Sequence, residues 1–162
     1  MKRLFFILLF FGVLLLCACG REYGILDYQS KDISAECLIN GEYRVKIEKR
    51  GDSCHVELKE PRTAEGISFD ITKDGVIARA GNVEIPIERQ HLSGICAIGS
   101  IFSQSEECLS SAVQEGGGSV LTFQNEGCTY KITMGEHSVP KRVCIFSESF
   151  EYDIEICSIE LN

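Results

Sequence analysis

Cysteine and histidine are the residue types in this sequence with the widest chemical range, and the chain of 162 residues has nine cysteines and three histidines. No two cysteines have the C-x-x-C spacing of a zinc knuckle or a redox motif. The histidines, His55, His91 and His137, form neither an H-E-x-x-H motif nor an H-x₃₋₅-H pair. No calcium-loop pattern of spaced acidic residues is present. The sequence therefore predicts neither a metal site nor a cofactor.

Three short patterns invite a catalytic or phosphate-binding interpretation, and none supports it. Cys54 and His55 are neighbours in a predicted strand, so their side chains face opposite ways. Residues 138–141 have the S-x-x-K spacing of penicillin-binding enzymes but lack the K-T-G and S-D-N partners. Residues 116–118 are three glycines that precede a strand rather than a helix, unlike a phosphate loop. The sequence predicts no catalytic residues, and a cell-wall hydrolase is the weakest alternative.

The first two cysteines lie at the end of an N-terminal apolar segment. The chain begins Met1-Lys2-Arg3, with two basic side chains. The apolar run Leu4–Leu16 follows, which is shorter than the roughly 20 residues that span a membrane. This order is typical of a secretory signal peptide. Leu16 to Gly20 reads Leu-Cys-Ala-Cys-Gly and resembles the lipobox of bacterial lipoproteins. That resemblance implies cleavage before Cys19 and attachment of a diacylglycerol to its thiol. An ordinary secretory signal with two incidental cysteines is the alternative.

These observations predict three segments and a location. Residues 1–18 are the signal peptide, 19–23 a lipidated tether and 24–162 a single domain, held on the outer face of the cell membrane through the lipid on Cys19. Residues 1–18 hold two of the 16 basic residues and none of the 24 acidic ones, so the remaining chain has a formal charge of −10. Such an acidic domain argues against nucleic acid and anionic headgroups as partners.

Seven cysteines remain in the predicted domain: Cys37, Cys54, Cys96, Cys108, Cys128, Cys144 and Cys157. Because this number is odd, at least one thiol stays unpaired. Cys37, Cys54 and Cys128 fall on the apolar side of an alternating pattern, where a free thiol behaves as a small apolar group. The pattern favours mostly reduced, buried thiols, although up to three disulfides remain an alternative.

Apolar and polar residues alternate between turn signals from about residue 24 to 88, which predicts consecutive antiparallel strands. A loop at residues 39–41 is expected to pair Cys37 with Tyr43, and a turn at residues 50–51 to pair Ile47 with Cys54. In the next hairpin we expect Ala78 opposite Ile71 and Ala80 opposite Phe69. Pro86 predicts that its strand lies at a sheet edge or leads out of the sheet.

One central region has helical periodicity. Leu92, Ile95, Cys96, Gly99 and Phe102 form an apolar stripe. Ser103 and Glu106 resemble a capping box and predict a second helix, with Leu109, Ala112 and Val113 facing inward. Further strands are expected at about 119–124, 128–134, 142–147 and 150–160. The predicted fold is α+β and mainly β: a strongly curved antiparallel sheet, or unclosed half-barrel, whose concave apolar face is covered by the central helical segment.

Two passages of the sequence carry a family resemblance. The first is residues 56–61 (Val-Glu-Leu-Lys-Glu-Pro) with Gly66-Ile67 and Asp74-Gly75; the second is residues 130–132 (Tyr-Lys-Ile) with Pro140. They resemble the outer-membrane lipoprotein carrier (LolA-like) superfamily, and most closely small lipoproteins of Gram-positive bacteria that share its fold. The resemblance implies a domain that carries acyl chains on a concave apolar face or that acts as an adaptor. A ferrying carrier is soluble, however, whereas this chain is predicted to be anchored.

The leading functional hypothesis is a groove on the concave face that binds an acyl chain, a lipid or an apolar peptide. Its predicted lining is Val45, Val56, Phe69, Ile85, Leu92, Ile95 and Phe102. The alternative is a structural adaptor that pairs through an edge strand with a second copy or with a cell-envelope enzyme such as a wall amidase. A binder needs apolar space that its own side chains leave open, whereas an adaptor needs a filled core and a free edge.

Overall fold

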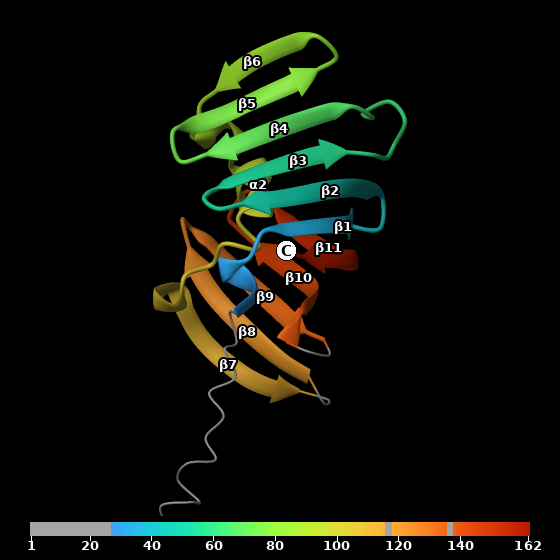
Figure 1. The fold of residues 1–162 in the computed structure, drawn as a ribbon. Helices are drawn as coiled ribbons and strands as arrows, with labels where there is room; N and C mark the ends of the chain where they lie inside the picture. The colour runs from blue at the N-terminus through green and yellow to red at the C-terminus, as the bar shows by residue number, and fades with distance from the viewer. Residues whose placement is uncertain (1–26, 116–117, 136–137) are drawn as a thin grey trace, which may run out of the picture.

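The computed structural model describes residues 27–115, 118–135 and 138–162 (Figure 1). The predicted signal peptide, Cys19 and the tether lie outside the described residues. The elements, in chain order, are η1 (Asp27–Ser30), β1 (Ile33–Ile39), β2 (Tyr43–Arg50), β3 (Ser53–Leu58), β4 (Ile67–Thr72), β5 (Gly75–Ala80), β6 (Val83–Ile87), η2 (Arg89–Leu92), α2 (Ser93–Gly99), η3 (Glu106–Cys108), β7 (Leu109–Glu115), β8 (Gly118–Asn125), β9 (Cys128–Met134), β10 (Pro140–Phe146) and β11 (Glu151–Leu161).

All the strands form one antiparallel sheet in the order β6-β5-β4-β3-β2-β1-β11-β10-β9-β8-β7. The first and last strands pair at its centre, and β6 and β7 are its two edges. Figure 1 shows the β1–β6 half turned steeply against the β7–β10 half, so the sheet curls without closing. The predicted fold class is confirmed, and so is the edge position of the strand that holds Pro86.

The predicted strand faces are right, but the predicted registers are displaced by two residues. Cys37 pairs with Val45 instead of Tyr43, Ile47 with Val56 instead of Cys54, and Phe69 with Ala78 instead of Ala80. A shift by an even number preserves which side chains share a face. In the first hairpin the turn begins one residue later than expected, with Asn40 and Gly41 at φ 51° and 71°. Ile39 thereby stays in β1, where it is buried.

The predicted second helix is wrong. Residues 106–108 form the 3₁₀ turn η3, in which Ser105 rather than Ser103 accepts a hydrogen bond from the Glu107 N–H at 3.2 Å. Residues 109–115 then form the edge strand β7, which places Ala112 opposite Leu121. Two serines and a valine in this stretch disfavour a short helix, and pairing with β8 supplies the backbone hydrogen bonds instead.

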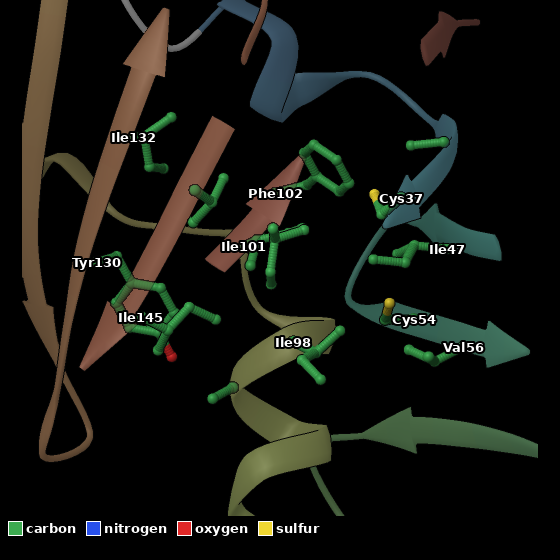
Figure 2. Packing of buried hydrophobic residues seen from close by; sticks show 14 of the residues in the cluster. Cys37, Ile47, Cys54, Val56, Ile98, Ile101, Phe102, Tyr130, Ile132 and Ile145 are labelled. Atoms are coloured by element: carbon green, nitrogen blue, oxygen red, sulfur yellow. The ribbon is translucent and has the colours of Figure 1, made fainter. Parts of the chain in front are cut away.

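A single central segment packs against the middle of the concave face. Figure 2 shows Ile98, Ile101 and Phe102 projecting between the two halves of the sheet, with Ile47 on one side and Tyr130 on the other. Ile101 and Phe102 are completely buried. The predicted helical stripe is partly corrected here, because α2 ends at Gly99 and Phe102 follows it in a turn. Ile98 and Ile101, which were not in that stripe, are more deeply buried than Leu92 and Ile95.

Two glycines let α2 approach the sheet closely. A Cβ atom on Gly94 would lie 2.5 Å from the Tyr152 hydroxyl, and one on Gly99 would lie 2.5 Å from Cδ1 of Ile71. The Ser100 hydroxyl, directly after the helix, is 2.9 Å from the Tyr130 hydroxyl. The helix and the residue after it therefore contact β4 on one side and β9 and β11 on the other.

This packing predicts that Phe102, in the central segment, and Phe69, on the sheet face below it, contribute unequally to stability. Phe102→Ala should lower the free energy of unfolding by about 3–5 kcal/mol, because it opens a cavity in a filled core. The matched change Phe69→Ala should cost only about 1–2 kcal/mol, since that ring is only partly buried. Urea denaturation of both variants measures the difference. Equal losses would show that Phe69 is packed as completely as Phe102.

Candidate functional site

The structure separates the seven predicted groove residues by depth. Val45, Val56 and Phe102 are buried in the core, Phe69, Leu92 and Ile95 are partly buried, and Ile85 is 52% exposed. The buried three contact other core side chains, so a ligand would reach them only if the central segment moved. The more exposed ones lie where the cover ends, and they define the candidate site.

One row of side chains shows how the cover ends. Ile47, Val56, Phe69, Ala78 and Ile85 are cross-strand partners that follow one another from β2 to β6 on the concave face. Ile47 and Val56 are completely buried, Phe69 and Ala78 are partly exposed, and Ile85 is half exposed. The row therefore passes from the core to solvent without a change from apolar to polar residues.

The neighbouring row is covered along most of its length. Cys54, Ile71 and Val76 are buried on β3, β4 and β5. The helix α2 contacts β3 and β4, and η2 contacts β5. The cover thus lies over the end of these strands that leads to the β4–β5 turn, and the opposite end stays open.

We call Leu58, Phe69, Ala78, Val83 and Ile85 the open apolar patch. Val83, on the edge strand, is 57% exposed, and Leu58 on β3 is partly buried. Phe69 and Ile85 were predicted from the sequence, whereas the other three members were missed. Strand parity placed Val83 on the face of Ile85, but how far α2 reaches over that face depends on packing that no local pattern encodes.

Arg89 links the two halves of the sheet at the end of the concave face that α2 and η2 cover. Its guanidinium donates to the Thr72 carbonyl at 2.8 Å and to the Glu126 carboxylate at 3.3 Å. These contacts join the β4–β5 turn to the β8–β9 turn, which lie in opposite halves of the sheet. The apolar concave face is consequently accessible from the opposite end, at the open apolar patch.

The other face of the same strands carries a chain of charged groups. His55 Nδ1 is 2.6 Å from an Asp70 carboxylate oxygen, Asp70 also pairs with Arg79, and Arg79 Nε donates to Glu84 at 2.8 Å. All four side chains are substantially exposed, so the pairs contribute little stability. Among the hydrogen bonds of the described residues, none joins the His55 imidazole to a nucleophilic side chain. Cys54 lies on the opposite face, buried near α2.

The described part of the chain contains seven free thiols. Burial raises the pKa of the Cys37 and Cys54 thiols to about 12 and also raises the pKa of Cys96. Cys157 is exposed on β11. Within residues 27–115, 118–135 and 138–162, no group of three or more His, Cys, Asp or Glu side chains is placed to hold a metal ion.

No protein-family model and no curated protein matches this sequence. A solved structure of an uncharacterized conserved protein from Thermus thermophilus is similar in fold, with a TM-score of 0.53 and 16% identity over 85% of both chains. A LolA superfamily protein from Nitrosomonas europaea has a TM-score of 0.43 and 11% identity over 85% of this chain and 92% of that one. A domain described as a putative outer membrane lipoprotein-sorting protein, from Vibrio parahaemolyticus, has a TM-score of 0.46 and 13% identity over 88% of both chains.

These likenesses concern the fold alone. The curved, unclosed sheet is the architecture that the sequence resemblance implied. In the described ranges, no helix is long and apolar enough to cross a membrane.

The thiols supply a test of the burial pattern. Iodoacetamide reacts with thiolates, so in the folded protein it should modify Cys157 first and leave Cys37 and Cys54 unmodified. Peptide mass spectrometry before and after denaturation in guanidinium measures the order, and the Cys157→Ser variant should lack the fast reaction. Modification of Cys37 or Cys54 at the rate of Cys157 would contradict the packing described above.

Proposed function

We propose that this protein is a lipid-anchored protein of the bacterial cell envelope that binds an acyl chain or another apolar ligand at the open apolar patch. The row from Ile47 to Ile85 carries this proposal, because its apolar character continues beyond the point where the protein's own cover stops. A contiguous apolar surface left in water is typical of an interaction site.

The residues of the patch suit a ligand that makes no directional bonds. Ala78 lies between the larger Phe69 and Ile85 in the paired row, and its side chain is a single methyl group. Leu92 and Ile95, on η2 and α2, are partly buried apolar neighbours of the same core. An acyl chain gains about 0.8 kcal/mol for each methylene that it buries, and it needs no hydrogen-bond partner.

The predicted anchor would keep the domain close to a source of such chains. The described domain begins at Asp27. A fully extended link from Cys19 to Asp27 spans at most about 30 Å, the product of its length and roughly 3.5 Å per residue. Two acyl chains on Cys19 would make the attachment stable, whereas one chain gives only marginal binding.

The adaptor hypothesis has an observation of its own. The two edge strands have exposed apolar side chains, Ile85 on β6 and Val113 on β7, and the centre of the core is filled. Such an edge can pair with a strand of a second copy or of a cell-envelope enzyme such as a wall amidase. We favour the apolar ligand because the patch extends inward from the edge to Phe69 and Leu58, which a partner strand added to β6 would not contact.

A charge in the patch should abolish ligand binding. Ile85→Asp should raise the Kd for a fluorescent fatty acid at least tenfold and remove any lipid that co-purifies with the protein, because the carboxylate would have to be desolvated. Stability should change little, since the side chain is half exposed. Fluorescence titration and lipid mass spectrometry measure these effects.

Ile77→Asp is the matched control, because Ile77 is 38% exposed on the opposite face of the same hairpin. It should bind the fatty acid as the unmodified protein does. If both variants lose binding equally, the hairpin edge and not the concave face is involved. If the unmodified protein binds no fatty acid, the adaptor hypothesis is the better one.

The anchor is tested separately. Cys19→Ala should prevent incorporation of radiolabelled fatty acid and either release the protein or leave its signal peptide uncut, because the acceptor thiol is gone. Cys17→Ala should still be labelled. Persistent labelling of the Cys19→Ala protein would refute the assignment and point to Cys17.

A further inference from the structure

The two edge strands of the sheet differ in the backbone groups that they offer to solvent. In an antiparallel sheet, alternate residues of a strand direct their N–H and C=O groups to one neighbouring strand, and the residues between them direct theirs to the other. On an edge strand, every second residue therefore faces outward. The hairpin turns tell which residues these are, because the two residues that flank a two-residue turn bond to each other.

On the edge strand β6, proline occupies one of the outward positions. The two-residue turn after Ala80 makes Glu84 and Pro86 the residues of β6 whose backbone faces outward. Pro86 has no N–H, and its ring occupies the place where a partner strand would lie. A strand added at β6 would find only the N–H of Glu84 as a donor. The β6 edge is therefore protected against pairing.

On the other edge strand, β7, both outward positions keep their N–H. The turn of the β8–β9 hairpin follows Asn125, so Val120 is one of the β8 residues that bond to β7. Its partner is Val113, which leaves Ala112 and Gln114 facing outward. Among the backbone hydrogen bonds that the described residues form outside the sheet, none involves Ala112 or Gln114. Two N–H and two C=O groups of β7 are thus available to a partner strand.

The composition of β7 gives its edge little protection. Natural sheet edges carry charged residues, proline or bulges that prevent pairing. Leu109–Gln114 contains no charged residue and no proline. A bulge lies between Leu109 and Ser111, so the regular part of the edge is Ser111–Glu115. Val113, in the middle of this part, is 50% exposed.

This regular part of the edge is complementary to itself. When two copies lie antiparallel about a two-fold axis at Val113, Ala112 of each copy is opposite Gln114 of the other. Each of these two pairs exchanges two hydrogen bonds, so the register uses both outward residues of both copies. The two Val113 side chains meet between these pairs, at a non-hydrogen-bonded position, where side chains are closest. Val120 is the cross-strand partner of Val113, so a row of four valines crosses both copies.

The charges of the molecule also favour this edge for contact with a second copy. The chain after residue 18 has a formal charge of −10, so two copies repel each other over most of their surfaces. Ser111–Gln114 is uncharged, and the register about Val113 sets Glu115 opposite Ser111 rather than opposite another acidic residue. The two-fold pairing therefore sets no like charges opposite each other.

We propose that two copies of this protein associate through antiparallel pairing of β7 with β7, centred on Val113, to form one continuous sheet. The open apolar patch lies at the opposite edge of the sheet, so this inference does not rest on the proposed function. The paired segment is short and buries less area than a standard interface, so the association is weak. A covalent trap is the suitable measurement.

Oxidative crosslinking of the full-length lipoprotein, with detergent micelles in excess, tests the register. Val113→Cys should form a disulfide-linked dimer, because residues of a non-hydrogen-bonded pair have Cα atoms about 4.5 Å apart, within reach of a disulfide. Ala112→Cys is the matched control, since the two copies of residue 112 would be diagonal neighbours about 7–8 Å apart. Both variants also carry Cys157→Ser, which removes the exposed native thiol.

Val113→Cys should crosslink at least tenfold faster than Ala112→Cys. Equal rates, or no dimer of the Val113→Cys protein, would overturn the proposal. Oxidation of intact cells identifies the partner, because the product should have twice the mass of the chain. A Val113→Cys product with a different protein, and none with twice the mass, would show that the partner is not a second copy.

Ala112→Pro tests the backbone hydrogen bonds of the interface. The N–H of Ala112 faces outward, so proline should leave the bonds within the sheet intact, as Pro86 does on β6. Added to Val113→Cys, it should slow crosslinking at least tenfold while the urea midpoint changes little. Unchanged crosslinking in the folded Ala112→Pro protein would overturn the pairing. If proline unfolds the protein, the comparison of Val113→Cys with Ala112→Cys decides alone.

Discussion

The insertion of Ile98, Ile101 and Phe102 between the two halves of the curved sheet is the contact on which the rest of the structure depends. The sheet pairs its first and last strands at the centre, so its two halves face each other across one concave space. A single connection, between β6 and β7, packs into the middle of that space. Gly94 and Gly99 allow the close approach, and Arg89 joins turns from both halves beside it.

The short length of this insertion also determines what stays uncovered. The helix α2 ends at Gly99 and contacts β3 and β4. It does not extend over the outer part of the row from Ile47 to Ile85. Near the end of β2 that leads to β3, the buried side of the strand ends in Lys49, which lines a depression together with Gln104 from the segment after the helix. The same insertion thus borders two different environments, one apolar and one polar, and both are open to solvent.

Much of this architecture follows from the sequence. Alternation in residues 33–88 and 128–134 predicted the strands and their buried faces, because a side chain's face depends only on parity. Parity cannot distinguish registers that differ by two, and burial of Ile39 decided between them. The strand at 109–115 was missed because its apolar spacing fits a helix, and only the neighbouring β8 edge favours a strand. The burial of Lys49 was missed because a polar residue at an apolar position of an alternating pattern reads as exposed, and that of Gln104 because it lies in the irregular segment after α2, where no periodicity applies.

The central claim is that an apolar ligand binds where the cover ends. Photo-crosslinking with a diazirine fatty acid, followed by peptide mapping, tests it most directly because it reports the position of the bound chain. We predict labels on β4 to β6, in peptides that include Phe69 and Ile85, and their loss when excess unlabelled fatty acid is present. Labels confined to the β7 edge, or labelling that unlabelled fatty acid does not reduce, would contradict the claim.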